Sequence, residues 1–146
     1  MTTKTSGDYL TNRAWLSDII NGDNIILRCG SALEFLQMFV GYVNEKEIDV
    51  YARVKGEYDN INYRIVECFD NIDYFKKDNT LCTTFSQTIN DMLADFDHTD
   101  ELALTEALCN YYYEHGESFD GLYIKPENQA VFENLKSSAI EYCIGA

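Results

Sequence analysis

The sequence has little of what marks a linker, a membrane segment or a secreted protein. It contains one proline and eight glycines in 146 residues, and no Ser- or Gln-rich tract, which argues against long disordered stretches. Its longest purely apolar runs, such as 25–27 and 38–40, are far shorter than the roughly 20 residues that span a bilayer. Residues 1–6 lack the apolar core of a signal peptide. We therefore expect a cytoplasmic protein that does not associate with a membrane.

The cysteines show no pairing pattern. Their number is odd and no two of them have C-x-x-C spacing, so the sequence predicts neither a disulfide framework nor a zinc site. Most have apolar neighbours, where a free thiol packs as a small hydrophobic group. We expect free thiols, most of them packed among apolar neighbours, at the five positions Cys29, Cys68, Cys82, Cys109 and Cys143.

Positive charge is scarce, especially in the second half of the chain. The formal net charge is -14. Residues 88–146 hold twelve Asp and Glu against two Lys, a net of -10, whereas residues 1–87 hold thirteen acids against nine bases, a net of -4. Phosphate contacts need Lys and Arg, so direct binding to nucleic acid is not expected. An acidic surface favours a basic protein partner, although it can also serve only to keep the protein in solution.

The hydrophobic periodicity predicts strands first and helices later. Residues 47–55 alternate cleanly between apolar and polar, and the turn residues 56–60 lead into a second strand over 61–69, so this pair should form an antiparallel hairpin. The fold class is α+β: one domain over 1–146, with a small mixed or antiparallel sheet in 1–83 and an acidic helical part in 84–146. The other expected elements are a helix over 9–20, a strand over 25–29, a buried helix over 31–42, a short strand over 81–83, and helices over 84–96, 100–114 and from 126 onwards.

The segment from Gly30 to Asp49 resembles metal-dependent nucleotidyltransferases. Those enzymes hold a triphosphate on a Gly-Ser turn at the start of a helix, here Gly30 and Ser31. A following strand presents two carboxylates two residues apart, here Glu47 and Asp49, which can share Mg²⁺ ions. Glu67 is the nearby candidate for a third carboxylate, although alternation sets it on the face of apolar residues. The opposing interpretation treats Glu47 and Asp49 as the solvent face of a hairpin strand, with no cofactor.

A larger part of the chain resembles the C-terminal domain of AbiEi-type abortive-infection antitoxins. The resemblance covers 26–52, with its Gly30-Ser31-Ala32-Leu33 helix start, then 81–93 and 100–112. The family's Glu-Arg pair is replaced by Ser86-Gln87, and the residues before Ile25 leave room for one helix rather than the family's winged helix. The resemblance implies a regulatory or protein-interaction domain, not an enzyme.

A third hypothesis starts from the carboxylates. Anti-CRISPR and antirestriction proteins occupy DNA-binding grooves by presenting acids where phosphates would lie. Tyr112 and Tyr113 belong to a run of three tyrosines that either packs within the protein or anchors an interface. The residues proposed to contact a basic or nucleic-acid-binding protein are Asp91, Asp95, Asp97, Asp100, Glu101, Tyr112, Tyr113, Glu114, Glu117 and Asp120.

The remaining polar patterns do not predict a site. Residues 95–101 superficially resemble a calcium loop but lack its glycine and final glutamate, and capping of a helix by Asp97 or Thr99 explains them better. His98 and His115 have no second histidine at ligand spacing, so no metal site is expected.

Overall fold

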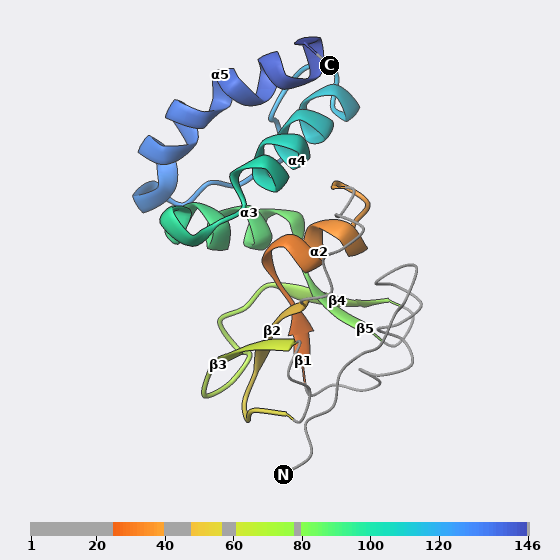
Figure 1. Ribbon diagram of the computed structural model, residues 1–146, viewed down its shortest axis with the longest axis vertical. Helices are drawn as coiled ribbons and strands as arrows, with labels where there is room; N and C mark the ends of the chain where they lie inside the picture. Colours follow the sequence, from red (N-terminus) through yellow and green to blue (C-terminus); the bar gives the residue numbers. More distant parts are fainter. Residues whose placement is uncertain (1–24, 40–47, 57–60, 78–79, 146) are drawn as a thin grey trace.

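A computed structural model describes residues 25–39, 48–56, 61–77 and 80–145, with side chains up to residue 142 (Figure 1). The fold is α+β, as the periodicity predicts. The helix expected over 9–20 lies outside the described residues. In chain order the elements are β1 (Ile25–Leu27), α2 (Cys29–Phe35), β2 (Ile48–Ala52), β3 (Ile61–Ile65), β4 (Tyr74–Lys77), β5 (Thr80–Thr83), α3 (Phe85–Ala94), the 3₁₀ turn η1 (Phe96–His98), α4 (Glu101–Glu114), the 3₁₀ turn η2 (Pro126–Asn128) and α5 (Gln129–Gly145).

The five strands form one mixed sheet in the order β3-β2-β1-β5-β4. β1 pairs antiparallel with β2 and parallel with β5, and β4 pairs antiparallel with β5. β2 and β3 run parallel, with Ile48 opposite Ile61 and Ala52 opposite Ile65. The predicted antiparallel hairpin is therefore wrong. Alternation determines which face a side chain takes, but it carries no information about strand direction.

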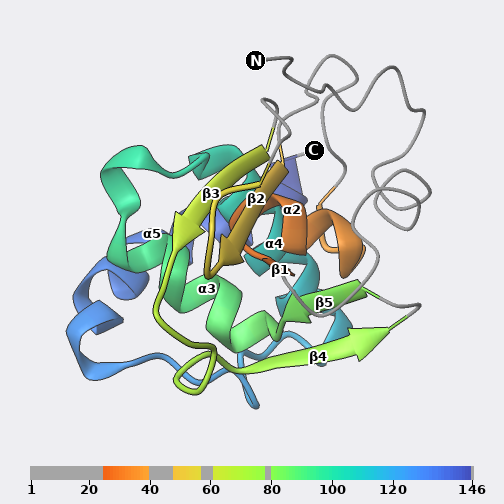
Figure 2. The same ribbon diagram turned by 90° about the horizontal axis from the view of Figure 1, so that it is seen from below.

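The described helices all lie on one side of the sheet (Figures 1 and 2). α2 lies between the sheet and the later helices, and it therefore buries side chains against both of them. Ala32 and Phe35 pack with the sheet residues Ile48 and Val50, while Leu33 packs with the residues of α3, α4 and α5. On the opposite face of the sheet, a smaller cluster is formed by Ile26, Tyr51 and Leu81, with Val66, Phe69 and Ile72 packed against it.

α2 is shorter than its apolar stripe predicts. Gln37 adopts a left-handed conformation with φ of 62° just past the end of the helix. The N–H of Gln37 donates to the carbonyl of Glu34, and the N–H of Met38 donates to that of Leu33. This pair of bonds is a Schellman motif, which ends a helix and normally has glycine at the left-handed position. The predicted helix over 31–42 therefore ends early, and residues 40–42 lie outside the described residues.

Two of the helices after residue 84, α3 and α4, begin at capping side chains. The Thr84 hydroxyl accepts from the N–H of Gln87 at 3.3 Å at the start of α3. α4 begins after Asp100, whose carboxylate accepts from the N–H of Ala103 at 3.1 Å. The expectation that Asp97 or Thr99 caps this helix is therefore wrong. Thr99 instead donates its hydroxyl to the carbonyls of Met92 and Asp95.

The cysteines are not uniformly free. Cys29, Cys68 and Cys82 are free thiols, but Cys109 is disulfide-bonded, and its partner side chain lies outside the described residues. The expectation of five free thiols is wrong at this position, because spacing along the chain does not report which helices pack together in space. Within the described ranges, no helix combines the length and the apolar character that crossing a bilayer requires.

Candidate functional site

The turn between β1 and α2 meets β2 at a cavity of about 320 Å³. We call it the turn cavity; its wall includes Arg28, Cys29, Gly30, Ser31, Asp49, Asn62, Asp95, His98 and Asp100. The structure thus brings Gly30, Ser31 and Asp49 together, as the nucleotidyltransferase hypothesis requires. Arg28, the end of α3 and η1 also line the cavity, and the sequence pattern did not connect these parts of the chain with the turn.

The polar groups of the turn are engaged within the protein. Ser31 is buried, and its hydroxyl accepts a hydrogen bond from the backbone N–H of Asp49 at 2.9 Å. The Asp49 carboxylate accepts from Asn62 at 3.1 Å. A side-chain carbon added at Gly30 would meet nothing within 4 Å, so no close approach requires glycine there. With only seven residues, α2 also offers a weak dipole to an anion. Through these contacts, Ser31 and Asp49 link the turn to β2, which is a structural role.

Cys29 occupies the strained position of this turn. Its φ is 49°, in the left-handed region that most side chains avoid. A strand-to-helix turn of this kind presents the nucleophile in some hydrolases. Burial raises the pKa of the Cys29 thiol to about 12, so the thiol is protonated near neutral pH and is a poor nucleophile.

Of the three expected catalytic carboxylates, the structure describes Asp49 and Glu67, and these two do not converge. Glu47 lies outside the described residues, and Glu67 is exposed and lines a different cavity from Asp49. An antiparallel hairpin turning at residue 58 would set Glu67 opposite Asp49, since both are equally far from that residue along the chain. In the parallel pair Asn62 is opposite Asp49 instead, and β3 continues for roughly 10 Å to its end at Ile65. The strand direction therefore moves Glu67 away.

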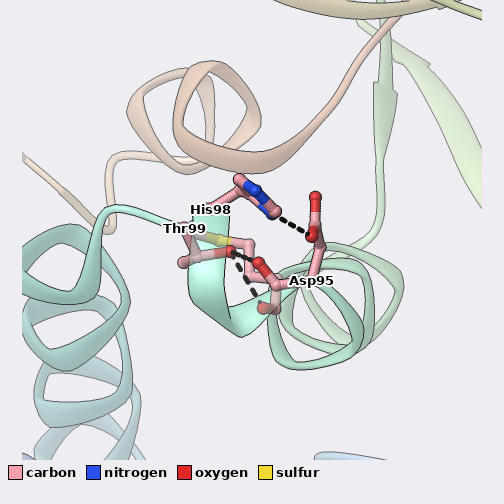
Figure 3. A network of polar contacts seen from close by, with 4 residues as sticks. Asp95, His98 and Thr99 are labelled. Carbon is pink, nitrogen blue, oxygen red and sulfur yellow. Dashed lines mark hydrogen bonds and ion pairs between the residues drawn. The ribbon is translucent and has the colours of Figure 1, made fainter.

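His98 and Asp95 form an ion pair at the edge of the turn cavity (Figure 3). Nδ1 of His98 lies 2.9 Å from the Asp95 carboxylate. The hydrogen bond to Asp95, together with its negative charge, raises the pKa of His98 above its ordinary value. The two hydrogen bonds of Thr99, each 2.9 Å long, hold the chain at the end of α3. Across the described residues, no three His, Cys, Asp or Glu side chains are grouped to hold a metal ion.

A larger cavity of about 680 Å³ lies beside the turn cavity and shares Arg28 and Asp95 with it. We call it the arginine cavity; its wall includes Arg28, Tyr51, Arg64, Val66, Glu67, Ile72, Asp91, Ala94, Asp95 and Lys125. The guanidinium carbon of Arg28 lies 4.7 Å from the centre of the Tyr51 ring. Burial, followed by the nearby Asp91 carboxylate, raises the pKa of Tyr51 to about 12. Tyr51 is therefore a neutral phenol in this cluster.

Asn90, near the middle of α3, fixes the segment that carries Lys125. Its side chain is buried and donates to the carbonyl of Tyr123 at 2.8 Å. It accepts from the N–H of Lys125 at 2.8 Å and from the Asn128 side chain at 3.0 Å. It also donates to the carbonyl of Ser86 in α3 at 2.8 Å, so four polar groups meet at a single carboxamide. Sequence reasoning missed Arg28, Arg64, Asn90 and Lys125, because nothing along the chain signals that they meet.

The carboxylates proposed to contact a partner fall into two groups at opposite ends of α4. Three of those near its start have roles within the protein: Asp91 accepts from Gln87, Asp95 pairs with His98, and Asp100 caps the helix. Asp97 and Glu101 in the same group are exposed. Those near its end, Glu114, Glu117 and Asp120, are exposed. The helix places Glu101 and Glu114 roughly 20 Å apart along its axis. The ten residues therefore do not form one continuous patch.

The three tyrosines at the end of α4 mostly pack within the protein. Tyr111 is buried, stacks on Phe85 with ring centres 5.0 Å apart, and donates its hydroxyl to the carbonyl of Asp120. Tyr112 packs on Phe119 at 5.0 Å. Tyr113 remains 39% exposed. Of the two tyrosines proposed as interface residues, Tyr113 is the one that presents its ring to solvent.

No family model and no curated protein matches this chain. The resemblance to antitoxin domains and to nucleotidyltransferases remains a prediction from the sequence.

Proposed function

We propose that this chain is a non-catalytic protein-interaction domain that binds a basic or nucleic-acid-binding partner. The observation that carries the proposal is a set of three exposed carboxylates at and just past the end of α4: Glu114, Glu117 and Asp120. None of them forms an ion pair with a described Lys or Arg side chain. Tyr113 adds an exposed ring beside them.

The position of these acids is unfavourable for the helix itself. The carboxyl end of a helix carries a partial negative charge, so acids there are destabilising and bases are stabilising, by about 0.3–1 kcal/mol each. The last turn of α4 holds no base. By contrast, Asp100 and Glu101 lie at the start of α4, where negative charge is favourable. The carboxylates at the start are accounted for by the helix, and those at the end by a role outside it.

The expected biological setting is phage defence or counter-defence. It rests on the resemblance to AbiEi-type antitoxin domains, and on the general ability of an acidic surface to occupy a basic, nucleic-acid-binding groove. An antitoxin-like role and DNA mimicry predict the same kind of contact. They differ in the partner: a toxin in the first case, and a nuclease or other DNA-binding protein in the second.

The test is capture of partners from a bacterial lysate at low and at high salt, followed by identification of the retained proteins. We compare the wild type with a triple variant, Glu114→Gln, Glu117→Gln and Asp120→Asn. The matched control removes three exposed charges that are not among the proposed contacts: Glu127→Gln, Glu133→Gln and Glu141→Gln. A basic partner should be lost in high salt and with the first triple only. Equal loss with both triples, or retention of no basic protein at low salt, contradicts the proposal.

A metal-dependent nucleotidyltransferase is the second candidate, supported by the common cavity of Gly30, Ser31 and Asp49. Thermal shift with Mg²⁺ and nucleoside triphosphates tests it. Stabilisation that requires Mg²⁺ and is lost in Asp49→Asn supports an enzyme and counts against the interaction domain.

A further inference from the structure

The arginine cavity gathers positive charge in a protein that has little of it. Three of the eight Lys and Arg side chains in the described ranges line it, and each comes from a different segment. Arg28 precedes α2, Arg64 lies on β3, and Lys125 precedes η2. None of the three forms an ion pair with a carboxylate of the described residues. Three carboxylates, Glu67, Asp91 and Asp95, line the same cavity, so its formal charges balance. An anion there would be held by direct contact with the three basic side chains and not by net charge.

Two incomplete hydrogen-bond sets belong to the same wall. In the described part of the chain, two buried side-chain polar atoms have no hydrogen-bond partner: Nε of Arg28 and one carboxylate oxygen of Asp91. Both residues line the arginine cavity. A buried polar atom without a partner costs about 1–3 kcal/mol, so such atoms are uncommon away from binding sites. One is a donor and the other an acceptor, and the Tyr51 phenol interacts with both side chains, so the two atoms belong to an internal cluster of Arg28, Tyr51 and Asp91 at the cavity wall.

The size and the walls of the cavity restrict the ligand further. A volume of about 680 Å³ is typical of small-molecule sites. A water molecule takes roughly 30 Å³ in the liquid, so an inorganic ion would leave most of this space empty. Val66, Ile72 and Ala94 form an apolar part of the wall. Glu67 and Asp95 add acceptors for hydroxyl or amino groups.

We propose that the arginine cavity binds a small organic phosphate of nucleotide size. Arg28, Arg64 and Lys125 hold the phosphate, the apolar wall takes the base or a comparable moiety, and Glu67 or Asp95 accepts from a hydroxyl or amino group. Lys125 is held in place for this contact, because its backbone N–H is fixed by the buried carboxamide of Asn90. The site adjoins the turn cavity, with which it shares Arg28 and Asp95, and it is independent of the proposed protein partner.

The test is isothermal titration calorimetry of the whole chain with ADP in EDTA at low salt, since phosphate capture by these side chains needs no metal. Arg64 and Lys125 are both exposed, so Arg64→Gln and Lys125→Gln should fold, which circular dichroism checks. Each should weaken ADP binding about tenfold or more, the loss of one charge-assisted hydrogen bond. Lys77→Gln removes an exposed cation that does not line the cavity, and should bind ADP as the wild type does.

Adenosine, inorganic phosphate and glutamate complete the comparison. ADP binding at least about tenfold tighter than each of the three supports the proposal. Phosphate binding as tightly as ADP overturns it, because the apolar wall then contributes nothing. Preferential binding of glutamate overturns the phosphate assignment. Equal weakening by Lys77→Gln, or no measurable binding of ADP, overturns the site itself.

Discussion

Replacing Asn90 with alanine should destabilise the protein more than its small change in volume suggests. The carboxamide makes three hydrogen bonds to the segment before α5, with Tyr123, Lys125 and Asn128. A buried hydrogen bond contributes roughly 1 kcal/mol net, so the three together give about 3 kcal/mol. Domains of this size are stable by about 5–15 kcal/mol, so this loss is a large fraction of the total.

Urea unfolding followed by circular dichroism measures the loss. Asn110→Ala is the matched control, because the Asn110 side chain makes one long-range bond, to the carbonyl of Met38 at 2.8 Å, and should cost about 1 kcal/mol. Hydrogen exchange at the Lys125 amide should also accelerate in Asn90→Ala, since its acceptor is removed. If Asn90→Ala costs no more than Asn110→Ala, the reasoning that this carboxamide organises the later segment is refuted.

Three further predictions concern local conformation and titration. Gln37→Gly should raise the free energy of unfolding by about 1 kcal/mol in the same urea assay, because Gln37 has a positive φ; no change or a loss contradicts the left-handed helix end. Iodoacetamide at pH 8 should modify the exposed Cys68 in the folded protein but spare Cys82, whose pKa burial raises to about 12; mass spectrometry of peptides decides. NMR titration should find the pKa of His98 above its ordinary value, and Asp95→Asn should lower it. Because the pKa of His98 is raised in the folded protein, its pair with Asp95 stabilises the protein at low pH, and this contribution disappears as pH rises through the folded pKa. If the pKa of His98 is the same in Asp95→Asn as in the wild type, the pair is excluded.

The sequence predicts most local features of the fold correctly. Alternation over 47–55 locates β2, and the capping residue Thr84 locates the start of α3. Each of these depends on residues within a few positions of one another, where side-chain periodicity and capping chemistry act directly. The end of α2 was missed because the left-handed position is filled by Gln37, and glutamine gives no signal for that conformation.

The site depends on geometry that local patterns do not contain. Ser31 and Asp49 could be brought together from the sequence, because a strand, turn, helix and strand follow one another there. Glu67 could not be placed, since its position depends on whether β3 runs parallel or antiparallel to β2. The convergence of Arg28, Arg64 and Lys125 depends on how three distant segments pack, and no periodicity records it.

The outermost strand β4 also determines how two copies of this sheet can meet. It is a short strand whose Lys76 and Lys77 are exposed at the open edge of the sheet. Lysine at an edge discourages a second sheet from adding its strand there, because pairing would desolvate the charge. At the other edge, β3 carries the half-exposed Ile65 beside the exposed Arg64. Both outer strands of the described sheet therefore present a cation that a second copy would have to desolvate before its strand could pair there.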